Sequence, residues 1–163
     1  MKNQLALIVF FATSIIFANT VSAANQEKKA VRMAAKQFYA ALNQMFTGDL
    51  DLMKNVWSHK EDVTYMGPDG GFHHGWKQVV ADWEKQAAMK LGGTVMPQEM
   101  RITVGPELAI VSNYEIGKNK GPEGQIRNVK IRATSLFRKE NGKWKMIGHH
   151  TDLLPFLMKK PQH

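Results

Sequence analysis

Four side chains near the C-terminal end of the chain could act together on a small molecule. They are Arg132, Thr134, His150 and Asp152. An arginine offers a fixed fork of hydrogen-bond donors to a carboxylate or an enolate, and a histidine exchanges a proton near neutral pH. Asp152 could orient His150 for that exchange or could pair with Arg132. The alternative is a structural ion pair between Arg132 and Asp152, beside a buried histidine whose hydrogen bonds are satisfied.

A predicted β-hairpin positions these four residues. Two runs rich in β-branched and aromatic residues flank Glu140-Asn141-Gly142, whose glycine can adopt the left-handed conformation that closes a short turn. A three-residue loop places Arg132 opposite His150, and alternation along the strands puts Thr134 and Asp152 on the same face. A two-residue loop would shift the register and separate Arg132 from His150.

Two pairs of adjacent histidines raise the question of a metal site. They are His73-His74, close to Asp69, and His149-His150. Neighbouring side chains of an extended segment project to opposite sides, so at most one of each pair can serve one site. The spaced triad that a zinc enzyme requires does not occur, and the chain has no cysteine for thiolate ligands, disulfides or thiol redox chemistry. We therefore expect no metal and no cofactor.

The first residues form a predicted signal peptide. Lys2 gives a positive start, residues 5–17 are largely apolar, and Val21-Ser22-Ala23 fits a small-residue cleavage site. The apolar run is too short for a convincing membrane span, and no later segment approaches the length needed. We expect a signal peptide at 1–23 and one domain at 24–163 that is periplasmic or secreted. An uncleaved anchor is the alternative.

The charge of the chain is basic but dispersed. The formal net charge is +8 at pH 7, and the lysines and arginines form no compact stripe interleaved with aromatic residues. This pattern is typical of a solvated basic surface and argues against nucleic-acid binding.

The order of predicted elements indicates an α+β domain. Apolar residues recur at helical spacing over 26–46, a short helix follows Asp49, and a third helix begins after Gly75. The later part of the chain has the alternation of strands. The predicted strands are 62–66, a brief extended piece at 72–74, 94–104, 108–116 and the two arms of the hairpin. Helices first and a strand meander later predict three helices packed on one sheet.

The same order resembles the nuclear transport factor 2-like (cystatin-like α+β barrel) superfamily, and in particular its SnoaL-like branch. The likeness is carried by five pieces: Gly48-Asp49, Val63-Thr64-Tyr65-Met66-Gly67-Pro68 leading to Gly75-Trp76, the run from Arg132 to Lys139, the run from Gly142 to Ile147, and His150. The resemblance implies a strongly curved mixed or antiparallel sheet that forms a cone-shaped half-barrel around a pocket. It also implies homodimers through the outer sheet face.

The resemblance further implies that Arg132 and His150 point into the pocket. We expect Thr134, Tyr65 and Trp76 to join Arg132 in binding a ligand, and His150 and Asp152 to be the catalytic candidates. Steroid isomerase-like members carry a carboxylate base on the first strand, where Val63-Thr64-Tyr65-Met66 has none. Epoxide-hydrolase-like members use an Asp-Arg-Asp arrangement, of which only Arg132 and Asp152 are identifiable.

Glu115 is a further candidate carboxylate. Asn113-Tyr114-Glu115 lies near the middle of a predicted strand, and either Asn113 or Glu115 could face the interior. Alternation alone does not say which face is inside.

Three hypotheses follow. The first is an exported domain that binds a small, partly apolar molecule in its pocket, with Arg132 and His150 at the polar end and aromatic residues along the apolar body. The second is a cofactor-free isomerase or hydrolase with His150 as the proton carrier. The third is a non-catalytic dimerisation or adaptor domain.

Overall fold

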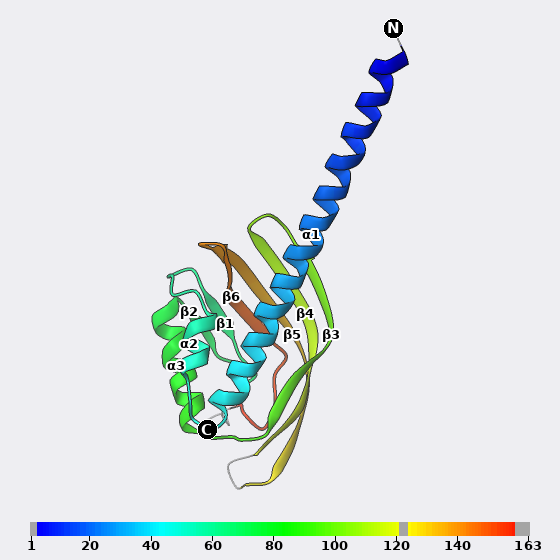
Figure 1. Cartoon of the computed structure of the whole chain (residues 1–163). Coiled ribbons are helices and arrows are strands. Elements are labelled where there is room, and N and C mark those ends of the chain that lie inside the picture. Colours follow the sequence, from blue (N-terminus) through cyan, green and yellow to red (C-terminus); the bar gives the residue numbers. More distant parts are fainter. Residues whose placement is uncertain (1–2, 121–123, 159–163) are drawn as a thin grey trace.

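The computed structural model describes residues 3–120 and 124–158, with side chains from residue 23 onward. These residues form three helices: α1 (Asn3–Met45), α2 (Asp51–Val56) and α3 (Trp76–Ala88). They combine with six strands, and Figure 1 shows α1 running across one face of the sheet while α2 and α3 lie beside it. The strands are β1 (Thr64–Met66), β2 (Phe72–His74), β3 (Thr94–Val104), β4 (Leu108–Lys120), β5 (Ile126–Glu140) and β6 (Lys143–Thr151).

The sheet is open and mixed. Its strand order is β2-β1-β6-β5-β4-β3, and the β1–β6 pair is parallel while the other pairs are antiparallel. The predicted α+β class and curved half-barrel are confirmed. β4 continues to Lys120, beyond the predicted end at residue 116, because pairing with both β3 and β5 satisfies its backbone even where the side chains are polar.

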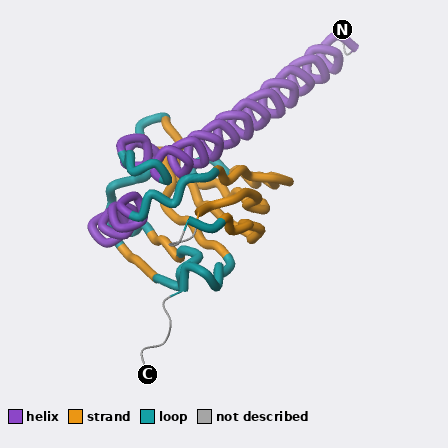
Figure 2. Tube along the Cα trace, turned by 90° about the horizontal axis from the view of Figure 1, so that it is seen from below, coloured by secondary structure: helices purple, strands orange, loops and turns teal. Residues whose placement is uncertain are grey.

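Helix α1 contacts the sheet with its C-terminal half only. Burial begins at Val31 and recurs at Ala34, Ala35, Phe38 and Leu42, the spacing that predicted the helix. The helix is longer than predicted, and its N-terminal turns project away from the rest of the molecule (Figures 1 and 2). Among the residues described with their side chains, no helix is long and apolar enough to cross a membrane.

The β5–β6 hairpin differs from the predicted register. Its turn has two residues, Asn141 and Gly142, both with positive φ (49° and 75°), which matches the twist of the flanking strands in an Asn-Gly hairpin. A bulge follows, so that Thr134 lies opposite His150. The prediction of a three-residue loop with Arg132 opposite His150 is therefore wrong.

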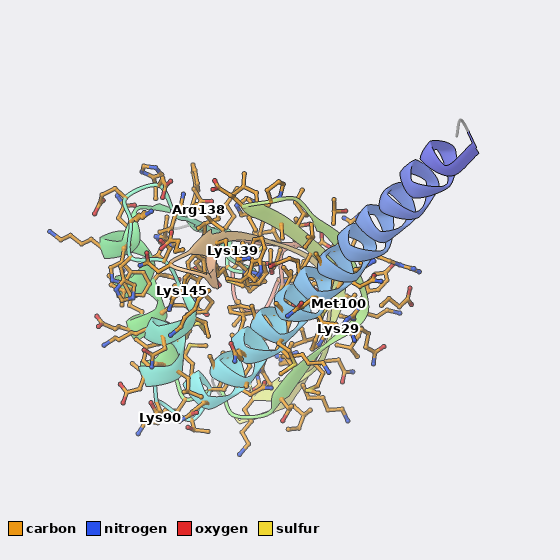
Figure 3. All side chains as sticks on the ribbon, turned by 45° about the horizontal axis from the view of Figure 1, so that its top comes forward. Lys29, Lys90, Met100, Arg138, Lys139 and Lys145 are labelled. Carbon is orange, nitrogen blue, oxygen red and sulfur yellow. The ribbon has the colours of Figure 1, made fainter. Side chains whose placement is uncertain are left out.

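The turn end of this hairpin is tied to α1. Glu27 on α1 accepts hydrogen bonds from Lys139 Nζ (2.5 Å) and Trp144 Nε1 (2.9 Å), and these bonds lower the pKa of the Glu27 carboxyl. Arg138, Lys139 and Lys145 gather at this end of the hairpin (Figure 3). The contacts fix the hairpin against the helix and so fix the direction of its interior side chains.

Candidate functional site

Arg132 lies on the outer face of the sheet. Its side chain is 77% exposed, and its Nε and Nη2 atoms donate to the two carboxylate oxygens of Asp152 at 2.8 and 2.9 Å. The Arg132 backbone N–H also donates to Asp152 Oδ2 at 2.9 Å, and these bonds lower the pKa of the Asp152 carboxyl. The expectation that Arg132 points into the pocket is wrong, and the pair matches the alternative of a structural ion pair.

His150 and Thr134 share this outer side with Arg132. His150 is half-buried, and its Nε2 lies 3.2 Å from Thr64 Oγ1. Thr134 is opposite His150 and contacts Ser112 across the strands, with 3.5 Å between the hydroxyl oxygens. The predicted sharing of one face by these side chains is confirmed, but the face is the outer one. The placement of His150 inside the pocket is wrong.

His150 makes the stability of the protein depend on pH. Burial, and to a lesser degree the nearby His149, lowers the pKa of His150 from its ordinary value near 6.5. The unfolded chain therefore binds this proton more readily than the folded chain, and stability falls as pH drops from about 6.5 towards the lowered folded pKa. We expect the urea concentration at the midpoint of unfolding to decrease when the pH is lowered from 7.5 to 5.5. The decrease should be smaller in His150→Asn. An equal fall in both proteins would contradict this.

The histidine that faces the interior is His149. Its side chain is 3% exposed, and its Nε2 lies 3.2 Å from Glu115 Oε1. Its Nδ1 lies 2.9 Å from the Ser135 hydroxyl oxygen. If the Ser135 hydroxyl donates to Nδ1, the proton of the neutral ring is on Nε2 and points at the carboxylate. The ring of Phe38 packs against His149, with 4.6 Å between centroids.

Glu115 is held by a second donor. Tyr39 OH donates to Glu115 Oε1 at 3.1 Å, and Asn113 Nδ2 donates to Tyr39 OH at 2.8 Å. Burial, reinforced by the charge of Glu115, raises the pKa of Tyr39, so that its phenol remains a donor. Glu115 Oε2 makes no hydrogen bond to any described residue. Asn113 and Glu115 both face inward, two residues apart on β4.

Glu115 and His149 line a small cavity between the helices and the sheet. Its volume is about 40 Å³, which is room for a few water molecules. Two further polar atoms, Trp83 Nε1 and Thr151 Oγ1, belong to lining residues and are buried without a hydrogen-bond partner among the described residues. The rest of the wall is mainly apolar: Leu42, Phe46, Leu91, Val95, Val129, Ile131, Leu154 and Leu157.

Of the two aromatic residues expected in the pocket, one lines it. Tyr65 is part of the wall, whereas Trp76 stacks on His59 outside it, with 4.2 Å between ring centroids. Within the part of the chain described with side chains, no group of three or more His, Cys, Asp or Glu residues could hold a metal ion.

The arrangement can bind and exchange protons. A carboxylate and an imidazole in contact provide an acceptor and a donor a few ångströms apart, with Tyr39 and Ser135 fixing their orientation. From the sequence, the interior histidine was predicted at position 150, and Ser135 and Tyr39 were not among the predicted site residues. The available signal was the composition of β5: Val129, Ile131, Ala133, Ser135 and Phe137 are small or apolar, while the alternate positions carry Lys130, Arg132 and Arg138.

The architecture defines the class of protein, because several solved structures share it. A "putative dehydratase from the NTF2-like family" of Streptomyces avermitilis has a TM-score of 0.70 at 20% identity, covering 80% of this chain and 98% of its own. A "putative calcium/calmodulin-dependent protein kinase type II association domain" of Thiobacillus denitrificans has a TM-score of 0.63 at 26% identity, covering 74% and 92%. A "putative ketosteroid isomerase" of Shewanella frigidimarina has a TM-score of 0.60 at 20% identity, covering 73% and 91%.

The chain belongs to the SnoaL-like domain family, whose model matches residues 31–153. The match begins at Val31, the residue at which α1 starts to be buried against the sheet. Comparison with curated proteins gave no match.

Proposed function

We propose that the protein binds a small, partly apolar molecule in the cavity, with the polar end of that molecule at Glu115 and His149. The observation that carries this proposal is the buried carboxylate–imidazole pair in a largely apolar wall. Such a wall with a few convergent polar groups is typical of small-molecule sites. Stability alone does not explain the pair, since apolar residues of similar volume often stabilise a protein as well as a buried ion pair does.

A fragment screen by NMR tests the proposal. The full chain is titrated with small alcohols, ketones and weak acids, and the Trp83 indole N–H signal reports on the cavity. We expect fragments that shift this signal to bind about tenfold or more weakly to Glu115→Gln, because a hydrogen bond to a charged group is lost. Glu107→Gln, on the exposed surface, is the control. The proposal fails if no fragment shifts the signal, or if both variants behave alike.

A second candidate is proton transfer without a cofactor. It is favoured by the contact between Glu115 and His149 and by the lack of a described partner for Glu115 Oε2, which leaves that oxygen free to accept a proton. Two of the similar structures carry the names of a dehydratase and an isomerase. In D₂O, exchange of the α-protons of acetone would be accelerated by the protein and not by Glu115→Gln. Equal exchange with both would remove this candidate.

Self-association is a further proposal, supported by apolar side chains on the outer sheet face. Met96, Leu108, Ile110 and Tyr114 are between 40% and 57% exposed, and such patches are typical of interaction sites. Light scattering of the full chain should show a dimer that Ile110→Glu weakens and Leu52→Glu, on α2, does not. A monomer at every concentration would contradict a dimer.

Export is proposed on the basis of the N-terminal segment. The small residues before Ala24 fit a cleavage site, and the first turns of α1 project beyond the sheet (Figure 1). Cells producing the full chain should yield a protein whose first residue is Ala24. Protein that begins at Met1 in the export fraction would contradict cleavage.

A further inference from the structure

A groove of about 580 Å³ adjoins the cavity. It lies between the loop at residues 67–71, α3 and the segment after β6. Pro68, Gln86 and Leu157 line both the groove and the cavity, so these side chains form the wall between them. A backbone hydrogen bond from Leu154 N to Pro68 O (2.8 Å) joins the segment after β6 to the loop.

The groove contains a second carboxylate–imidazole pair. His73 Nε2 on β2 lies 3.3 Å from Asp82 Oδ1 on α3, and the two side chains are 22% and 8% exposed. Nε2 makes no hydrogen bond to a described residue, while Gln86 Nε2 donates to Asp82 Oδ2 at 2.7 Å. A Cβ atom at Gly71 would lie 2.6 Å from His73 Nε2, so the loop has no side chain where the imidazole lies.

Tyr65 lies between the two pairs. Its ring is nearly parallel to both imidazoles, with centroids 6.1 Å from His149 and 6.2 Å from His73 and interplanar angles of 11° and 18°. Gln86 Nε2 donates to Tyr65 OH at 3.1 Å as well as to Asp82. The two pairs therefore lie on opposite sides of the wall that divides the cavity from the groove.

We propose that the cavity and the groove are the two halves of one elongated site, divided by the side chains of Pro68, Gln86 and Leu157, and that a bound ligand displaces Leu157. The inference rests on the proposed binding function. The volumes support a joint site, because the cavity holds only a few waters and the adjoining groove is much larger. Each pair offers a carboxylate acceptor and an imidazole that can donate, the combination that a hydroxyl group satisfies. The ligand class is an apolar chain with a hydroxyl group at each end.

NMR titration of the full chain with two probes tests this. Ethanol has one hydroxyl and is small enough for the cavity, and 1,10-decanediol has one hydroxyl at each end. The Trp83 indole N–H signal reports on the cavity, and the amide signals of Gly70 and Gly71 report on the groove. We expect ethanol to shift the Trp83 signal alone, and decanediol to shift both sets with one common Kd. Glycine signals that do not move, or two different Kd values for decanediol, would overturn the single site.

Two pairs of matched variants sharpen the test. His73→Ala should weaken the binding of decanediol about fivefold, through the loss of one hydrogen bond, and leave the binding of ethanol unchanged. His74→Ala, its exposed neighbour, should change neither. Leu157→Ala should strengthen the binding of decanediol. Leu153 is 50% exposed on the same segment, and Leu153→Ala should leave that binding unchanged.

The outcomes separate the two proposals. If the binding of ethanol depends on Glu115 while the binding of decanediol does not depend on His73 or Leu157, the elongated site is wrong and the cavity remains a binding site. If ethanol fails to shift the Trp83 signal, both proposals fail for alcohols.

Discussion

Replacing His149 by alanine is expected to lower the free energy of unfolding by about 3–5 kcal/mol, because it leaves the buried Glu115 carboxylate without the imidazole that contacts it. Both side chains are almost fully buried, so water cannot replace the lost contact without entering the cavity. Urea denaturation at pH 7 measures the loss. It should be accompanied by a shift of the Trp83 indole signal, since Trp83 and His149 line the same cavity.

His150→Ala is the matched control for this substitution. It changes the same residue type one position away, on the outer face, and it should cost less than half as much. The double variant Glu115→Gln/His149→Ala should recover part of the lost stability, because the unpaired charge is gone. Equal losses for His149→Ala and His150→Ala, or no recovery in the double variant, would show that Glu115 and His149 are not coupled in this way.

Replacing Gly117 by alanine is expected to destabilise the protein by about 3 kcal/mol or more. A Cβ atom at Gly117 would lie 2.0 Å from the Thr94 carbonyl oxygen and 2.8 Å from Val95 Cα. Both atoms belong to the backbone of β3, which pairs with β4 at this point, so relief requires the two strands to separate. The strands also carry Val95, Glu115 and Asn119 of the cavity wall.

Gly105→Ala is the control for the strand glycine. The nearest atom to its Cβ would be the Leu108 carbonyl oxygen at 3.3 Å, which requires only a small adjustment. Thermal unfolding should show a large decrease in melting temperature for Gly117→Ala and a small decrease for Gly105→Ala. If Gly117→Ala melted at the temperature of the unmodified protein, the close approach of β3 and β4 at this position would be wrong.

The sequence alone determined the layers of this protein. The spacing of Val31, Phe38 and Leu42 predicted which face of α1 is buried, and the core confirms it. Asn113 and Glu115 lie two residues apart on β4 and share its inner face, whereas the sequence indicated only that one or the other could face the interior. These features are local, since helical and strand periods follow from backbone geometry over a few residues. The family resemblance added the curved sheet, which the strand order confirms.

Only the tertiary structure decided which histidine faces the interior. The two-residue turn shifts the β5–β6 register by one position and the bulge shifts it by another, so Thr134 rather than Arg132 lies opposite His150. The two shifts together amount to two residues, so Arg132, Thr134 and His150 still share one face, as alternation predicted. Periodicity does not reveal which face of the hairpin is the interior. The packing of α1 and Phe38 then determined which face became the interior, and it placed His149 against Glu115 there.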